Sequence, residues 1–222
     1  MMMNLFSIFD PATSKTLTLN WTSLLLPLLF IPMIYWVIPS RIHFLWNKTS
    51  LLLFHELKNL FSKKNIKFIY IFIVLFWFIL TCNFMGLFPY IFTPTSHINL
   101  SSFLALPMWL TFMLYGWINQ TNHMFAHLVP LGTPIFLTVF MVCIETISNL
   151  IRPLTLSVRL TANMISGHLL LCLLSNIMEN MPLINWMILP VMIILLLLEM
   201  AVAVIQSYVF ITLTSLYLNE LN

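Results

Sequence analysis

Charged residues are scarce in this chain of 222 residues: lysine, arginine, aspartate and glutamate together make up 7% of it, against about 25% in ordinary globular domains. Apolar residues make up 61%, and the mean hydropathy is +1.00. Nine basic and six acidic side chains cannot cover the surface of a soluble protein of this size. The composition therefore excludes a soluble enzyme, a nucleic-acid-binding protein and a secreted disulfide scaffold, and it predicts an integral membrane protein.

Glycine and cysteine are also scarce. The chain has four glycines, and no glycine-rich nucleotide-binding loop occurs in it. Its three cysteines lie far apart in apolar sequence and form no C-x-x-C pair, so zinc and iron–sulfur sites are not expected. We expect all three to be buried structural thiols. The net charge of +3 is too small to indicate a polyanionic partner such as nucleic acid.

Long apolar runs predict an all-α membrane domain with about five membrane helices. The expected elements are residues 17–38, 68–92, 98–118, 135–176 and 182–218. As helices, the last two would measure roughly 60 and 55 Å, whereas the hydrocarbon core of a bilayer is roughly 30 Å thick. Each is therefore either two spans or one strongly inclined helix, and periodicity does not decide between them. Residues 119–134 and 177–181 are expected to be a polar loop and a short turn.

The segment 40–67 differs from these runs because it holds six of the nine basic residues, namely Arg41, Lys48, Lys58, Lys63, Lys64 and Lys67. Its apolar residues Leu53, Leu57, Leu60 and Phe61 recur at helical spacing. This pattern is typical of an amphipathic helix on the membrane surface, the alternative being a buried helix. The positive-inside rule places the segment on the inner side of the membrane, which puts the N-terminus outside and the C-terminus inside.

Four charged residues interrupt the two longest apolar runs: Glu145, Arg152, Arg159 and Glu199, accompanied by His168. A charge at the bilayer centre costs about 2.5–3.5 kcal/mol on insertion scales. Such residues normally mark an ion pathway, although structural ion pairs are the alternative, above all for Arg152, which precedes a proline.

Helical geometry arranges these groups. At 100° per residue, Glu145, Arg152, Arg159 and Asn163 fall within about 40° of one another, whereas His168 points about 180° away from Arg159. Along the axis His168 lies about 13 Å from Arg159 on one side, and Glu145 about 21 Å on the other.

Glu199 and Gln206 share a face of the last run, seven residues apart. Titratable groups at two depths thus flank a permanent cation, which predicts two proton-accessible pockets separated by Arg159. A proton crosses between them only on a partner that carries a membrane carboxylate.

The constellation resembles subunit a of F-type ATP synthases, in detail the mitochondrial form. The matching motifs are the run from Arg159 to His168 (RLTANMISGH), Arg152-Pro153, the run from Asn83 to Tyr90 (NFMGLFPY), the run from His127 to Pro134 (HLVPLGTP), and the residues Glu145, Glu199 and Gln206. The resemblance covers essentially the whole chain. Ser166 stands where alanine is more usual.

The resemblance implies a non-catalytic stator subunit that loads and unloads protons on the carboxylates of a ring of c subunits. It implies that Arg159 faces those carboxylates, that His168 and Glu199 belong to the half-channel from the intermembrane space, and that Glu145 belongs to the matrix exit. Asn163 and Gln206 would line the route. It further implies an inclined hairpin of the last two helices, other stator subunits as partners, a multi-pass place in the mitochondrial inner membrane, and no cofactor or metal.

Three alternatives remain at this stage. A haem-carrying respiratory subunit would need paired histidines on facing spans, and His123 and His127, spaced for a metal, lie in a polar segment where we expect them to be solvated. A proton-coupled secondary transporter would usually show an inverted repeat, and none is evident. A structural anchor would not require Arg159 and Glu199 at mid-depth.

Overall fold

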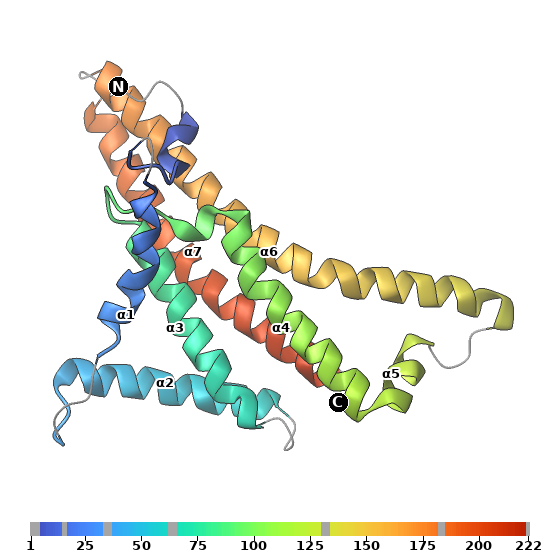
Figure 1. Ribbon diagram of the computed structural model, residues 1–222. Helices are drawn as coiled ribbons and strands as arrows, with labels where there is room; N and C mark the ends of the chain where they lie inside the picture. The colour runs from blue at the N-terminus through green and yellow to red at the C-terminus, as the bar shows by residue number, and fades with distance from the viewer. Residues whose placement is uncertain are drawn as a thin grey trace.

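The computed structural model describes residues 5–14, 17–32, 37–61, 66–129, 134–181 and 185–220 (Figure 1). Within these ranges the secondary structure is helical, without strands, which confirms the all-α prediction. The elements in chain order are η1 Leu5–Phe9, η2 Leu19–Leu25, α1 Leu26–Phe30, α2 Arg41–Leu60, η3 Ile66–Phe68, α3 Ile69–Gly86, η4 Pro94–Ser96, α4 Ile98–Asn119, α5 Thr121–Leu128, α6 Ile135–Asn180 and α7 Asn185–Glu220.

Four of the described helices, α3, α4, α6 and α7, are long and apolar enough to cross a membrane, and a shorter apolar helix covers Leu19–Phe30. The shorter one lies in the expected span 17–38. Its last helical residue is Phe30, because Ile31 precedes Pro32 and adopts an extended conformation with ψ 115°, which the proline ring favours sterically. Residues 33–36 lie outside the described part of the chain.

Each of the two longest apolar runs forms one continuous helix. Helix α6 has 46 residues and α7 has 36, so they measure about 69 and 54 Å, about twice the thickness of a bilayer core. The alternative of two spans per run is thereby excluded, and the pair forms the long hairpin that extends to the top of Figure 1. Helix α6 contains Pro153 and bends along its length (Figure 1), as helices do where proline removes a backbone hydrogen bond. It continues through Asn180, so the turn expected at 177–181 was wrong for its first four residues.

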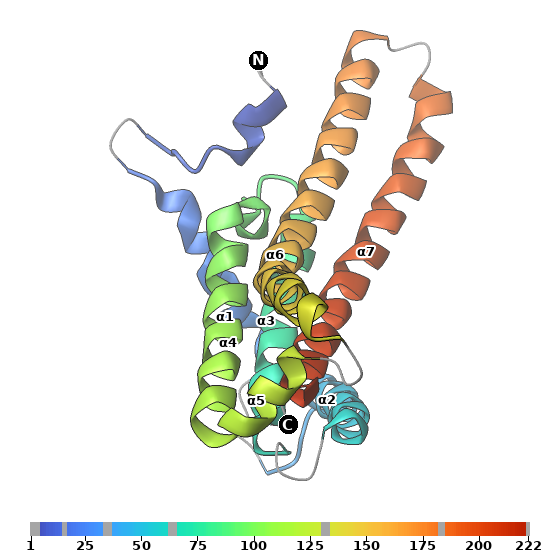
Figure 2. The ribbon, with the colours of Figure 1, turned by 90° about the vertical axis from the view of Figure 1, so that its right-hand side faces the viewer.

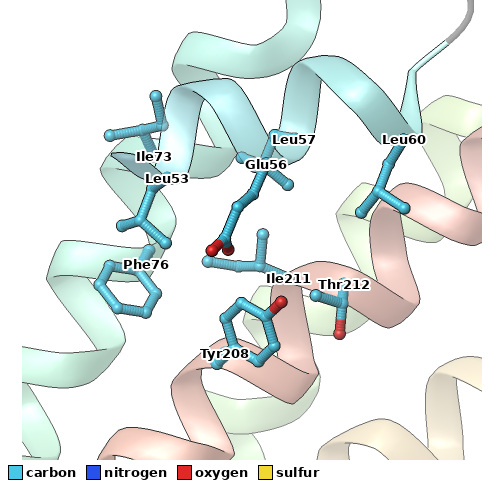
Figure 3. Close-up of a pocket in the computed structure, with 9 residues that line it drawn as sticks. All are labelled: Leu53, Glu56, Leu57, Leu60, Ile73, Phe76, Tyr208, Ile211 and Thr212. Carbon is cyan, nitrogen blue, oxygen red and sulfur yellow. The ribbon is translucent and has the colours of Figure 1, made fainter. Parts of the chain in front are cut away.

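Helix α2 lies across the bundle at its lower end in Figure 1. The side chains of Leu57 and Phe61 are buried in the core, and Figure 3 shows Leu57 beside Ile211 of α7 at an open hollow of ≈ 300 Å³ between α2, α3 and α7. The predicted apolar stripe therefore faces the neighbouring helices. Two of the basic residues of this segment, Lys63 and Lys64, lie outside the described residues.

The core is built mainly from the inner faces of α3, α6 and α7. Phe72 and Ile79 of α3, Leu160 of α6 and Phe210 of α7 are at most 1% exposed. These contacts hold α7 against α3, whereas α6 packs mainly against α4 and α7. The rest of the long helices carries exposed apolar side chains, as expected of surfaces that face lipid or partner subunits.

Two smaller expectations were wrong. The predicted loop 119–134 contains the helix α5, whose Phe125 packs edge to face on Trp117 of α4, with 5.0 Å between ring centroids. Cys82 is buried, but Cys143 is exposed and Cys172 is half-buried. Both differences come from tertiary packing, which brings α5 against α4 and turns one side of α6 away from the bundle.

The two ends of the bundle differ in what they hold. The N-terminal segment lies at the end opposite α2, near the tip of the α6–α7 hairpin, and the connection between α3 and α4 lies on that side (Figures 1 and 2). In both views, helix α5 and the C-terminus lie at the same end of the bundle as α2. The N-terminal segment and the α3–α4 connection both contribute residues to the polar site described next.

Candidate functional site

A polar pair joins α6 to α7 within their apolar contact. The side-chain amide of Asn163 donates a hydrogen bond to Gln206 Oε1, with 2.9 Å between the heavy atoms. Gln206 is 5% exposed and Asn163 is half-buried. A hydrogen bond formed away from water fixes the rotation of the two helices about their axes, because misalignment leaves two buried amides unpaired.

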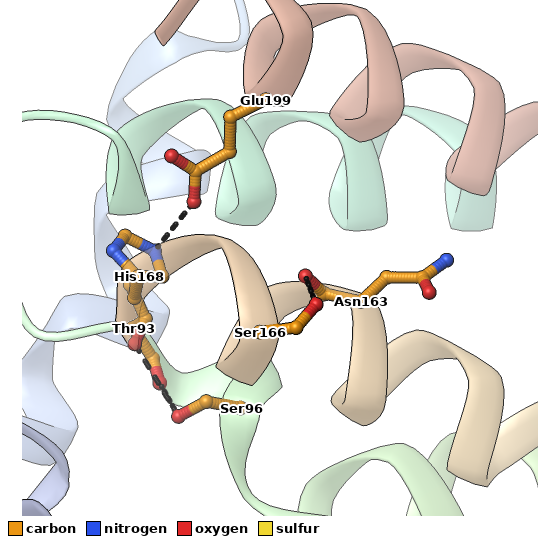
Figure 4. A network of polar contacts seen from close by, with 6 residues as sticks. All are labelled: Thr93, Ser96, Asn163, Ser166, His168 and Glu199. Carbon is orange, nitrogen blue, oxygen red and sulfur yellow. Dashed lines mark hydrogen bonds and ion pairs between the residues drawn. The ribbon is translucent and has the colours of Figure 1, made fainter. Parts of the chain in front are cut away.

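Farther along the same contact, His168 of α6 faces Glu199 of α7. His168 Nε2 lies 3.6 Å from Glu199 Oε1 (Figure 4). Glu199 is 3% exposed, and the His168 side chain is 13% exposed. The two titratable side chains are therefore within ion-pair distance, slightly beyond that of a hydrogen bond, and both are withdrawn from bulk solvent.

Gly167 makes the space that the Glu199 carboxylate occupies. A Cβ atom at Gly167 would lie 2.6 Å from Glu199 Oε1 and 2.9 Å from Glu199 Cδ, distances that side-chain atoms do not tolerate. The carboxylate thus lies directly on the backbone of α6. Any side chain at position 167 would displace it from His168.

The turn η4 and the end of α3 complete the surroundings of His168. A Cβ atom at Gly86 would lie 2.5 Å from Thr93 Cγ2 and 3.8 Å from His168 Nε2, so these three residues meet at one point. The Thr93 hydroxyl donates to Ser96 Oγ at 3.3 Å, and the Ser96 hydroxyl donates to the Thr93 carbonyl oxygen at 2.7 Å (Figure 4). On the remaining side, the Phe9 ring packs edge to face on His168, with 6.5 Å between ring centroids.

Arg159 differs from every other group of this site. Its side chain is exposed on the surface of α6, and no described residue gives it a hydrogen bond or an ion pair. Arg152, on the same predicted stripe, instead lies over the ring of Tyr217 of α7, with 5.1 Å from its guanidinium carbon to the ring centroid. The stripe therefore separates into one arginine that packs on an aromatic ring and one that faces outward.

Glu145 lies apart from the His168–Glu199 pair. It is half-buried on the first part of α6, about 21 Å along the helix from Arg159. The structure thus brings together two of the pairs expected from the sequence, Asn163 with Gln206 and His168 with Glu199. Arg159 and Glu145 stand separately from both.

Several residues of the site were not among those predicted, namely Phe9, Gly86, Thr93, Ser96 and Gly167. Asn83 of α3 is a further buried polar residue that was not predicted, since it is 1% exposed and neither polar atom of its amide has a partner among the described residues. A polar asparagine inside an apolar run and the cluster of threonine and serine at 93–96 were the signals available in the sequence. The proximity of the 93–96 turn to His168 depends on the packing of η4 against α6.

Neither of the neighbours found for His168 is a second histidine, whereas a haem with two histidine ligands needs a facing pair. His168 has Phe9 and Glu199 as its neighbours, and the exposed His123 lies on α5 at the other end of the bundle. The described residues contain no group of three or more histidine, cysteine or acidic side chains that is arranged to hold a metal ion. The arrangement suits proton exchange between a carboxylate and an imidazole.

Comparison with known proteins gives a full-length match. The model of the family described as ATP synthase A chain matches residues 16–219. Among curated proteins, ATP synthase subunit a of Drosophila simulans is 60% identical over 224 residues, which cover 100% of both chains. The protein of the same name from Anopheles gambiae is 58% identical over 100% of both chains, and that from Locusta migratoria is 56% identical over 99% of both.

Proposed function

Since the chain belongs to the ATP synthase A chain family, whose members are the proton-translocating stator component of the membrane sector, we propose that it separates two proton half-channels with Arg159. Membership of this family excludes the three alternatives of a haem-carrying subunit, a secondary transporter and a structural anchor. It also confirms the resemblance found in the sequence. The subunit itself contributes no group to the chemistry of ATP synthesis, so its part is to pass protons. Its catalytic partners lie elsewhere in the complex.

The observation that carries the proposal is the position of Arg159. An exposed guanidinium on a helix long and apolar enough to cross the membrane has no described partner, and a charge at such depth costs about 2.5–3.5 kcal/mol. A carboxylate on an adjacent subunit offsets this cost by ion pairing. The partner that fits is a ring of c subunits, each of which presents a membrane carboxylate to the outer face of α6.

The His168–Glu199 pair serves as the entry to the ring. Its members lie 3.6 Å apart beside Phe9 of the N-terminal segment, and Asn163 and Gln206 continue the polar contact toward Arg159. A proton that reaches Glu199 is handed to a ring carboxylate. The neutral carboxyl then enters lipid, because moving an uncharged acid there avoids most of the desolvation cost of the ion.

Glu145 serves as the exit. It lies on the other side of Arg159 along α6, about 21 Å away, where a carboxylate returning after nearly a full turn of the ring would lose its proton. Arg159 favours the ionised carboxylate and stays protonated itself, so it passes no proton directly between the two sides. The membrane potential supplies about 2.3 kcal/mol per charge per 100 mV for this cycle.

We further propose that the protein lies in the mitochondrial inner membrane with its N-terminus toward the intermembrane space and its C-terminus toward the matrix. Two observations support this orientation: the basic helix α2 and the C-terminus share one end of the bundle, and the N-terminal segment lies at the other. The other stator subunits of the complex are its remaining partners. The exposed apolar surfaces of α4, α6 and α7 face these subunits, the ring and lipid.

The entry path is tested by replacing its carboxylate without changing its shape. Glu199→Gln in the assembled complex should lower ATP-driven proton pumping in vesicles by an order of magnitude or more, because the amide does not take part in proton transfer. Glu179→Gln, an exposed glutamate near the end of the same hairpin, is the matched control and should pump normally. Normal pumping by a fully assembled Glu199→Gln complex would remove Glu199 from the path.

A further inference from the structure

The turn between α3 and α4 leads away from the His168–Glu199 pair toward a second histidine. Thr93, Thr95 and Ser96 of this turn are 5%, 1% and 4% exposed, an unusual burial for polar side chains in a connection between two spans. The Thr93 end touches the point where Gly86 and His168 meet. The other end of the turn is His97, which immediately precedes α4.

His97 lies in an aromatic enclosure. Its ring centroid is 5.2 Å from that of Trp21 and 5.3 Å from that of Phe92, and these two rings also contact each other at 5.7 Å. The residue as a whole is half-buried, but its Nε2 atom is shielded from solvent. That atom has no hydrogen-bond partner among the described residues.

Further buried polar atoms have no hydrogen bond among the described residues. They are Thr95 Oγ1 in the turn itself, both polar atoms of the Asn83 side chain on α3, and, within the His168–Glu199 pair, His168 Nε2 and both carboxylate oxygens. Burying an unpaired polar atom costs free energy, so apolar side chains would stabilise this turn better if it served only to pack. Hydroxyl groups, which donate and accept, and imidazole, which exchanges protons near neutral pH, are the groups a proton path requires.

We propose that His97 is the first proton acceptor of the entry path, ahead of His168. A proton taken up from the medium by the half-buried His97 imidazole leaves from the shielded Nε2 along the Thr93–Ser96 turn to His168, and His97 returns to its neutral form for the next proton. The rings that face His97 are Trp21 from η2 and Phe92 from the α3–α4 connection, and no described charged group forms an ion pair with it. The nearest titratable groups along the turn are His168 and Glu199. The inference rests on the proposed role of that pair.

The test compares His97→Gln with the parent in vesicles containing the assembled complex, driven by a proton gradient from the His97 side. Glutamine keeps hydrogen bonding but does not titrate, so ATP synthesis in weakly buffered medium should fall several-fold. Imidazole added on that side should restore the rate, because a mobile proton carrier replaces the missing acceptor. His123→Gln, an exposed histidine on α5, is the matched control and should change nothing.

An unchanged rate for assembled His97→Gln in weak buffer overturns the inference, as does a loss that imidazole does not reverse. His97→Asp and His97→Asn form a second comparison if glutamine prevents assembly, because the two side chains match in shape and only aspartate titrates. The inference requires the Asp variant to be faster, and equal rates overturn it. His168→Gln is measured in parallel: slow His168→Gln with normal His97→Gln overturns this inference alone, whereas normal rates for both overturn the entry path itself.

Discussion

At the scale of single residues, the absence of a side chain at position 167 determines how the two long helices meet. Glu199 lies against the α6 backbone because Gly167 has no Cβ, and from that position the carboxylate lies 3.6 Å from His168. Gly116 of α4 has a different neighbour, since a Cβ there would meet Met124 Sδ at 3.1 Å, within a flexible side chain. The two glycines therefore differ in how much a methyl group should matter.

Gly167→Ala is expected to lower ATP-driven proton pumping at least tenfold, because the new methyl group forces Glu199 away from His168. Alanine is otherwise favoured over glycine in a helix by roughly 0.5–1 kcal/mol, so the helix itself should not weaken. Gly116→Ala should keep normal pumping, since Met124 can change its rotamer. Equal pumping by the two variants, at equal levels of assembled complex, would contradict the role given to Gly167.

The Asn163–Gln206 hydrogen bond allows a second prediction at this scale. Gln206→Leu should destabilise the assembled complex by about 1–3 kcal/mol, because it leaves the Asn163 amide without its partner in a partly buried contact. The double variant Asn163→Leu/Gln206→Leu should recover part of that loss, since no orphaned amide remains. Thermal inactivation of the complex measures both losses. A double variant that loses more stability than the two single variants together would argue against this interpretation.

At the scale of elements, α2 is anchored by a small part of its surface. Leu57 is 4% exposed in the core, whereas Leu52 on the opposite side of the helix is 58% exposed. The helix therefore has one face that packs on α3 and α7 and another that meets its surroundings. Its attachment depends on the packed face alone.

Leu57→Ala should accordingly destabilise the protein by about 2–5 kcal/mol, the usual cost of a cavity left by a buried leucine. Leu52→Ala should change stability by less than about 0.5 kcal/mol, as exposed substitutions do. The temperature at which the assembled complex loses pumping activity reports the difference. Equal temperatures for the two variants would show that α2 is not held through Leu57.

Composition and periodicity predicted most elements because lipid imposes length and apolarity on each span. They did not decide whether residues 135–176 and 182–218 form two helices or four, because one inclined helix and two shorter spans place the same apolar side chains in the membrane. They also missed α5 within 119–134, where short polar helices and loops have similar sequences. The candidate residues were identified through their charge, but the Gly167–Glu199 approach and the turn beside His168 required the relative rotation of separate helices.

At the scale of the whole molecule, the two ends of the helix bundle carry different chemical groups. The N-terminal segment, whose Phe9 packs on His168 of the His168–Glu199 pair, lies away from α2, while the C-terminus lies near it. The orientation proposed for the membrane follows from this asymmetry and from the basic residues of α2. On the proposed path, a proton enters at one end and leaves at the other.

The orientation predicts which terminus a protease reaches. In mitochondria whose outer membrane has been removed, a tag at the N-terminus should be cleaved by added protease, and a tag at the C-terminus should be cleaved only after detergent is added. Soluble proteins of the intermembrane space and the matrix serve as markers of membrane integrity. Cleavage of the C-terminal tag alone in intact vesicles would reverse the assignment of entry and exit.

Proton flux through vesicles that contain the complex with Arg159→Ala tests the central proposal most directly. If Arg159 separates the two half-channels, driven pumping is lost while passive proton leak through the assembled complex is retained or increased. Arg152→Ala, which removes an arginine of the same helix that packs on Tyr217, should not raise the leak. Unchanged driven pumping by a normally assembled Arg159→Ala complex would contradict the barrier and leave Arg159 with a structural role.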